Sequence, residues 1–229
     1  AGQPWGLGMA LEDDGNMAML AGDYAQAKRS FEQSAALLLS IGDRWQAGAS
    51  LSHIGMLELL DGNFTAARRF FAERISIIQE IGNRSFLPYW LNGIAIAALE
   101  QGDYAAAHSA YVECLALAQE WRNHPSIAQA SYGLGMISLR QGEPEMACRR
   151  LRDSLTLLRP SGPPRAVAFC LLGLAELEAG DGRLESAARL CGAAQALLQA
   201  NQSGLWFELR HNYQRDIDAL LAQFTDPSS

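Results

Sequence analysis

A unit of forty residues that occurs five times is the feature that most limits how this chain can fold. One alanine is present in every unit, as Ala27, Ala67, Ala107, Ala147 and Ala187. A glycine stands five residues before each of these alanines, at Gly22, Gly62, Gly102, Gly142 and Gly182. Repetition at a fixed interval of this length is typical of architectures in which similar units stack on one another. The chain is therefore expected to be a stack of five similar units.

Each unit contains two stretches in which apolar residues stand three and four positions apart. Leu51, Ile54 and Leu57 show this spacing in the second unit. It is the period of a helix and not of a strand, so each unit is predicted to be a pair of helices. The recurring glycine follows the first helix, where a residue in the left-handed conformation closes the turn.

Polar residues that follow the turns are expected to cap the next helix by accepting a hydrogen bond from its free amides. Within the units these residues include Asp23, Asn63 and Asp103, and between units they are Asp43, Asn83 and Asn123.

Two kinds of packing position also repeat. Small residues such as Gly15 and Gly55 are expected to let paired helices approach closely, and a larger residue fills the space between neighbouring units. This larger residue is Phe31, Phe71, Tyr111, Leu151 and, in the last unit, Cys191. A single hairpin cannot bury its apolar stripe alone, so at least three must stack.

The combination of small residue, Gly-Asp-Tyr turn, alanine and aromatic residue resembles the tetratricopeptide repeat over about residues 3–203. The predicted fold is all-α, a right-handed α-α superhelix of five helical hairpins over residues 1–204. Arg74 departs from the pattern because Ser34, Cys114 and Ser154 hold that position in other units, and Glu143-Pro144 replaces the usual polar-aromatic pair. The second and fourth units are therefore expected to pack less regularly.

The end of the chain carries apolar residues at helical spacing, including Leu209, Tyr213, Ile217 and Leu220. They predict a capping helix over residues 205–224, because the last unit of such an array otherwise exposes its apolar side. Residues 225–229 are expected to be a disordered tail.

Residues 182–200, GRLESAARLCGAAQALLQA, show a narrower resemblance to the last repeat of LuxR-type and adenylate-cyclase-type bacterial signalling regulators. That resemblance implies that the chain is the sensor or interaction portion of a larger cytoplasmic transcriptional or signalling regulator.

Composition argues against several classes of partner. The net charge is −7 and the arginines are scattered, so no continuous basic face is available for nucleic acid. No apolar run is long enough for a membrane span, and the N-terminus lacks the layout of a signal peptide. The four cysteines are far apart without a CxxC pair, which favours free thiols in a reducing cytoplasm.

The sequence contains no motif that carries chemistry. It has no phosphate-binding loop, no HExxH and no nucleophile elbow, and its four histidines stand alone on different segments. We therefore expect no catalytic residue, no cofactor and no metal, and the chain is predicted not to be an enzyme.

Because no catalytic motif is present, the function left to consider is the binding of a partner through a surface of the repeats. In tetratricopeptide arrays the first helix of each unit lines the concave side, and the register carries that role to thirteen residues three or four positions apart. They are Glu12, Asn16, Ser52, Met56, Tyr89, Asn92, Ile96, Gln129, Tyr132, Met136, Phe169, Leu172 and Glu176. A face that mixes Tyr, Met, Asn and Gln suits contacts with a protein or peptide.

Two alternatives stay open for these residues. The groove could instead hold a small inducer, which an apolar cluster of Ile96, Tyr132 and Met136 would favour. Many of the residues, particularly Phe169 and Leu172, could simply pack against the adjacent repeat.

The first residues of the chain resemble the turn between the first and second units. Gly2 and Trp5 fall in register with Gly42 and Trp45, so residues 2–5 are predicted to form the same turn and to follow a further second helix in the natural protein. The first hairpin would then expose apolar residues, and we expect self-association through this end. The exposed residues would be Trp5, Met9, Met17 and Leu20.

Overall fold

The chain folds into helices throughout the residues that its structure, a computed structural model, describes, which are 2–158 and 164–200. The α-helices are α1 (Gly2–Ala21), α2 (Tyr24–Ser40), α3 (Arg44–Leu60), α4 (Phe64–Ile81), α5 (Leu87–Glu100), α6 (Tyr104–Glu120), α7 (His124–Arg140), α8 (Pro144–Leu158), α9 (Pro164–Gly180) and α10 (Leu184–Ala200). A short 3-10 helix, η1 (Arg84–Phe86), precedes α5. These residues form no strand, which confirms the prediction of an all-α solenoid of helical hairpins.

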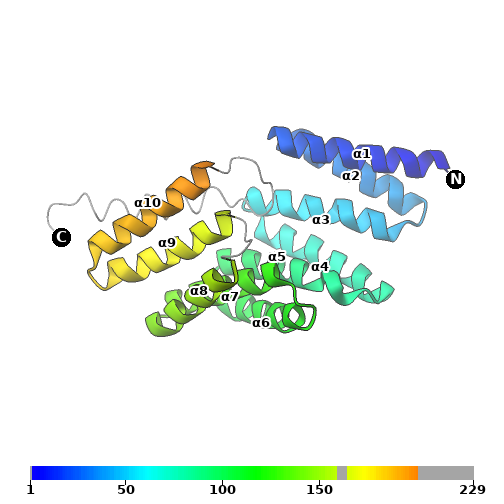
Figure 1. Cartoon of the computed structure of the whole chain (residues 1–229). Helices are drawn as coiled ribbons and strands as arrows, with labels where there is room; N and C mark the ends of the chain where they lie inside the picture. The colour runs from blue at the N-terminus through cyan, green and yellow to red at the C-terminus, as the bar shows by residue number, and fades with distance from the viewer. Residues whose placement is uncertain (1, 159–163, 201–229) are drawn as a thin grey trace. The chain divides into compact units, whose positions relative to one another are not determined.

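Two compact units make up the described chain. The first comprises residues 2–107 and the second residues 108–158 and 164–200, so the division falls within α6. Antiparallel hairpins are formed by α1 and α2, α3 and α4, α7 and α8, and α9 and α10 (Figure 1). The predicted capping helix at 205–224 and tail at 225–229 lie outside the described residues.

Left-handed glycines close the turns as the sequence predicts. Positive φ angles between 74° and 81° occur at Gly22, Gly42, Gly62, Gly82, Gly102, Gly142 and Gly182. Arg122 takes the same role with a φ of 51°. The amide of Asp23 donates to the carbonyl of Ala18 over 2.9 Å, and that of Glu143 donates to Ser138 over 2.8 Å. The fourth unit therefore has the same turn as the first despite its different sequence.

Most of the expected helix caps form. A backbone amide three residues further on donates to the side chains of Asp23, Asp43, Asp103 and Asn123. The prediction is wrong for Asn63 and Asn83, whose side chains make no capping bond. Asn63 instead donates to the Glu58 carboxylate over 2.8 Å, and Asn83 accepts from the Ser85 hydroxyl over 2.7 Å. An amide side chain can both donate and accept, so a close polar neighbour competes with the helix end.

The first unit is held together by two buried phenylalanines. Phe31 and Phe71 are both 0% exposed. A Cβ on Gly15 would lie 2.6 Å from the Phe31 ring, and one on Gly55 would lie 3.0 Å from the Phe71 ring. A Cβ on Gly93 would lie 2.9 Å from the other side of Phe71. Phe71 thus fills the space between α3 and α5, which confirms the predicted packing.

The second unit repeats this arrangement with Tyr111 and Leu151. A Cβ on Gly133 would lie 2.1 Å from the Tyr111 ring. One on Gly135 would lie 3.1 Å from Leu151, and one on Gly173 would lie 2.9 Å from the same side chain. Leu151 therefore fills the space between α7 and α9, as Phe71 does between α3 and α5.

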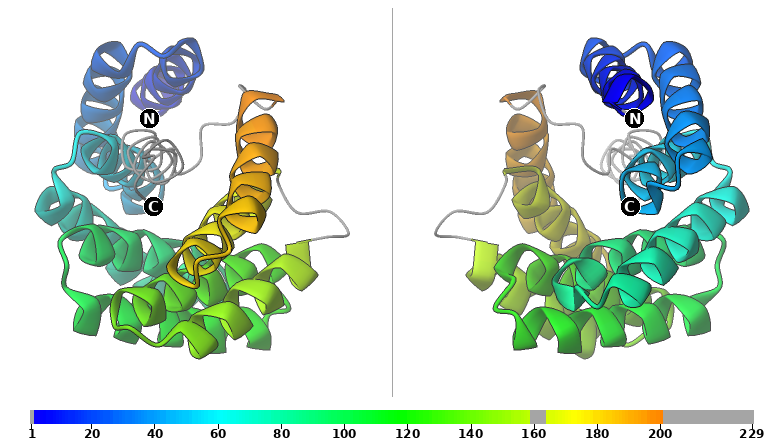
Figure 2. Two further views of the ribbon diagram at one scale, coloured as in Figure 1. Left: turned by 90° about the vertical axis from the view of Figure 1, so that its left-hand side faces the viewer. Right: turned by 90° about the vertical axis from the view of Figure 1, so that its right-hand side faces the viewer.

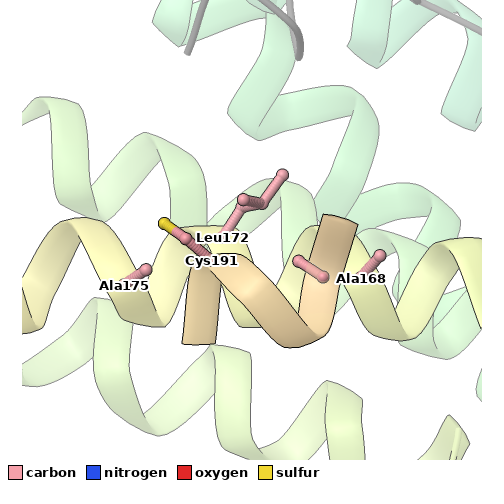
Figure 3. Packing of buried hydrophobic residues seen from close by; sticks show 5 residues of the cluster. Ala168, Leu172, Ala175 and Cys191 are labelled. Atoms are coloured by element: carbon pink, nitrogen blue, oxygen red, sulfur yellow. The ribbon is translucent and has the colours of Figure 1, made fainter. Parts of the chain in front are cut away.

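The last hairpin has a core of small side chains. Ala168, Leu172 and Ala175 of α9 pack with Cys191 and Ala194 of α10 (Figure 3). Cys191 holds the position of the larger residue in the other units and is 2% exposed. Leu172, which is 6% exposed, is the largest of the five buried side chains in this core.

Arg74 occupies the small-residue position of the second hairpin without opening it. Its Nη1 donates to the carbonyl oxygen of Trp45 over 2.6 Å, and its guanidinium carbon lies 4.2 Å from the centre of the Trp45 ring. A Cβ on Gly48 would be only 2.8 Å from Nη1, so the missing side chain makes the room. In the first hairpin, Ser34 at this position donates to the carbonyl of Gly8 over 2.8 Å.

The predicted turn at the start of the chain is not observed. Gly2 lies within α1, whereas Gly42 has a φ of 81°. The amides of Gly42 and Asp43 bond to carbonyls at the end of α2. The turn that residues 2–5 would form after a further helix in the natural protein stays a prediction.

Replacing Phe71 with alanine should lower the free energy of unfolding by about 3–5 kcal/mol, because the ring fills the space between three helices. Urea unfolding followed by circular dichroism measures this change. Phe86, which is 50% exposed, provides the matched control. Phe86→Ala should cost less than about 1 kcal/mol. Equal losses in the two variants would contradict the assigned packing.

Candidate functional site

The thirteen predicted contact residues lie on α1, α3, α5, α7 and α9, which are the first helices of the repeats. We call this set the first-helix face. Some of its residues stand beside a glycine that contacts the second helix of the same hairpin, as Met56 does beside Gly55. Others, such as Asn92 beside Gly93, stand beside a glycine that contacts the second helix of the preceding hairpin. Each unit carries its own part of the face, from α1, α3 and α5 in the first and from α7 and α9 in the second.

In the first unit most of the face is buried. Ser52 and Asn92 are 1% and 0% exposed, and Glu12, Met56 and Ile96 are also buried. Two further members, Asn16 and Tyr89, are half-buried.

Side-chain contacts account for some of this burial. The Ser52 hydroxyl donates to the carbonyl of Ala49 in its own helix over 2.6 Å. The Tyr89 ring meets the Trp90 ring edge to face at 4.5 Å. Burial raises the pKa of the Tyr89 hydroxyl, which is therefore neutral at physiological pH.

Two opposite charges are buried in the first unit. Glu12 is 9% exposed and Arg74 is 6% exposed. Burial and the neighbouring Asp13 carboxylate raise the pKa of Glu12, while the charge of Arg74 lowers it. Burial lowers the pKa of Arg74 and the charge of Glu12 raises it. Each charge therefore favours the ionised form of the other, although the two groups form no direct ion pair within 4 Å.

His53 lies on α3 beside these charges. Its imidazole stacks on the Phe31 ring at 4.6 Å with the planes 25° apart. Burial, with a smaller contribution from the Arg74 charge, lowers the pKa of His53 to about 4. The imidazole is therefore neutral in the folded protein at pH 7.

In the second unit the face is an aromatic and methionine cluster. The rings of Tyr132 and Phe169 lie 6.1 Å apart and are tilted by 33°. The Met136 sulfur lies 3.2 Å from the position of a Cβ on Gly173, so Met136 extends from α7 over α9. Tyr132, Met136, Phe169 and Gln129 are all half-buried. We call these four residues the α7/α9 cluster.

An ion pair lies at the C-terminal ends of the same helices. Arg140 Nη1 is 2.7 Å from Glu176 Oε1, and about a third of each side chain is exposed. Leu172, by contrast, belongs to the core of the last hairpin. Ile96, which was grouped with Tyr132 and Met136 as a candidate inducer pocket, belongs to the first unit.

The forty-residue repeat did not predict that Trp45, His53 and Arg74 lie beside the first-helix face. The signal for Arg74 was its departure from a small-residue column, but the partner of its guanidinium was not visible in the sequence.

The described residues show no arrangement suited to metal chemistry, since no three His, Cys, Asp or Glu side chains among them gather closely enough. Burial raises the pKa of the Cys114 thiol to about 12 and that of Cys170 to about 11, so neither is a reactive thiolate at neutral pH. No helix in the described part of the chain is both long and apolar enough to cross a bilayer.

Comparison with known proteins identifies the repeats. The sequence matches the family model of the tetratricopeptide repeat over residues 46–120 and over residues 86–159. A search of curated proteins found no match. The chain thus carries tetratricopeptide repeats, a helical scaffold suited to protein interaction.

Solved structures share the fold. Aspartyl phosphate phosphatase F from Bacillus subtilis has a TM-score of 0.69 at 13% identity, covering 91% of this chain and 57% of that one. BtubC from P. vanneervenii has a TM-score of 0.67 at 15% identity, covering 86% and 82%. PilF from Pseudomonas aeruginosa has a TM-score of 0.60 at 19% identity, covering 99% and 95%. None of these comparisons supports the narrower resemblance to LuxR-type and adenylate-cyclase-type regulators.

His53 should make the protein less stable in acid. Between pH 6.5 and pH 4 the unfolded chain takes up a proton that the folded chain does not, so the free energy of unfolding falls as the pH is lowered. From pH 7 to pH 5 this loss should be about 2 kcal/mol. His53→Phe should remove that part of the pH dependence, measured by urea unfolding at both pH values. His108→Phe, at an exposed position, should leave the loss unchanged; an unaltered pH dependence in His53→Phe would refute the assignment.

Proposed function

We propose that this array of tetratricopeptide repeats is a non-catalytic scaffold that binds a protein or peptide through its first-helix face. We further propose that it serves as the sensor or interaction portion of a larger cytoplasmic transcriptional or signalling regulator. The observation that carries the binding proposal is the α7/α9 cluster, in which half-buried aromatic, methionine and amide side chains lie together.

The chemistry of the cluster suits a peptide or helix with apolar side chains. Aromatic rings present large contact areas with few rotatable bonds, so little conformational entropy is lost on binding. The Met136 side chain can adapt its shape to different apolar groups. Gln129 and the Arg140–Glu176 pair add polar groups around the apolar contacts, as is usual at the rim of an interface.

The accessible members of the first-helix face are the better candidates for direct contact. Besides the α7/α9 cluster these are Asn16, Tyr89 and Glu176. Ser52, Asn92 and Leu172 have almost no exposed surface, so a packing role accounts for them more simply. Contact of a partner with any member of the face stays a prediction.

The regulator context rests on the resemblance of residues 182–200 to signalling regulators. Sequencing the complete gene tests it, because an attached NTPase or DNA-binding domain would support the context and a stand-alone repeat protein would oppose it. A small inducer is the alternative occupant, favoured by the apolar rings of Tyr132 and Phe169. Binding of apolar small molecules but of no peptide would favour that alternative.

A double variant tests the binding face. Peptides are selected from a random phage-displayed library on the immobilised chain, and the affinity of the tightest one is measured by calorimetry. Tyr132→Ala combined with Phe169→Ala should weaken it at least about tenfold, because two aromatic contacts are lost. Val112→Ala, at an exposed apolar position of α6 outside the face, is the control and should bind like the parent. Parental affinity in a folded double variant would count against the face.

A further inference from the structure

The last helix of the second unit ends beside the α7/α9 cluster. The helices α9 and α10 form an antiparallel hairpin, and Figure 2 shows them side by side in yellow and orange. The end of α10 therefore lies next to the start of α9, where Phe169 stands. Phe169 and Leu197, from these two ends, both pack against the core of the hairpin. The chain that follows Ala200 thus begins close to the cluster.

Residues 205–224, which we call the C-terminal segment, have the sequence pattern of an amphipathic helix. Four large apolar residues stand three or four positions apart and so share one face of a helix; this apolar stripe is Leu209, Tyr213, Ile217 and Leu220. The opposite face of such a helix carries His211, Arg215 and Asp218. A helix of this kind is stable when its apolar stripe is covered and its charged face stays in water.

The outer side of α10 offers little to this apolar stripe. The exposed residues of α10 are alanine, glycine or polar, among them Ala188, Gly192, Ala193 and Ala196. The leucines near its end, Leu197 and Leu198, pack against the core of their own hairpin instead. Because the stabilisation grows with the apolar area removed from water, a cap on the outer side of α10 would gain little from these small side chains.

The α7/α9 cluster offers a larger apolar contact. The rings of Tyr132 and Phe169 lie 6.1 Å apart, and Met136 extends over α9. All three side chains are half-buried, so each has surface left for a further contact. From Phe169 to Glu176 the face extends for about 10 Å, and a helix of about twenty residues is about 30 Å long. The C-terminal segment is therefore long enough to cover the cluster.

We propose that the C-terminal segment forms an amphipathic helix whose apolar stripe docks on the α7/α9 cluster of the same chain. The segment is attached beside the cluster, which gives it an effective concentration there of about a millimolar. A contact too weak to form between separate molecules is then still populated. A partner must displace the segment before it reaches Tyr132 and Phe169. This regulatory step rests on the proposed binding role of the cluster, whereas the docking itself does not.

Oxidation of Met136 by hydrogen peroxide in the full chain tests the docking, with the sulfoxide measured by mass spectrometry. Ile217→Glu places a charge in the apolar stripe and should raise the oxidation rate at least about twofold, because the segment no longer shields the sulfur. Ala222→Glu adds the same charge on the opposite face and should leave the rate at the parental value. Met146 of α8, which is 37% exposed and lies outside the cluster, is the internal reference.

Faster oxidation of Met146 as well would mean that Ile217→Glu has lost its fold, and the milder Tyr213→Ala then takes its place. Equal Met136 rates in the parent and in the folded stripe variant would overturn the inference, since the segment would then lie elsewhere. Light scattering that finds a dimer in the parent and a monomer in Ile217→Glu would assign the cluster to the segment of a second copy. That result would exclude docking within one chain.

The affinity of the library-selected peptide tests the regulatory step separately. Ile217→Glu should bind the peptide at least about fivefold more tightly than the parent, because its competitor is removed, and Ala222→Glu should bind like the parent. Equal affinities would contradict the competition but not the binding face. If no peptide binds any of the proteins and Met136 is still oxidised faster in Ile217→Glu, the docking is supported and the proposed binding function alone fails.

Discussion

The close contact between a glycine of one helix and a large side chain of another is the interaction on which both units depend. Phe71 touches Gly55 of its own hairpin and Gly93 of the next, and Leu151 touches Gly135 and Gly173 in the same way. One side chain thus fixes the pairing within a hairpin and the stacking of its neighbour. Because both contacts need the same spacing of small and large residues, the forty-residue register follows from packing and not from local helix preference.

The sequence was enough to predict the elements that depend on backbone conformation or on a repeated position. The left-handed glycines, the helix period and the columns of small and large residues belong to this group. The caps at Asn63 and Asn83 failed because Glu58 and Ser85 compete for their amides once the turns have formed. The contact of Arg74 with Trp45 likewise depends on a side-chain conformation that spacing does not specify.

For the candidate site, register predicted the face but not its accessibility. Tyr132 and Leu172 hold equivalent positions forty residues apart, yet Tyr132 is half-buried and Leu172 is 6% exposed. Leu172 packs with Ala168, Ala175 and Cys191 in the core of the last hairpin (Figure 3). The exposure of a groove position therefore depends on the volumes of neighbours from other helices, which no single column of the repeat contains.

The two units differ in how much of the first-helix face they leave exposed. In the first unit most of its members are buried, whereas in the second unit the four residues of the α7/α9 cluster are half-buried. A partner therefore has more side-chain surface to contact in the second unit, which is why the binding proposal depends on the α7/α9 cluster.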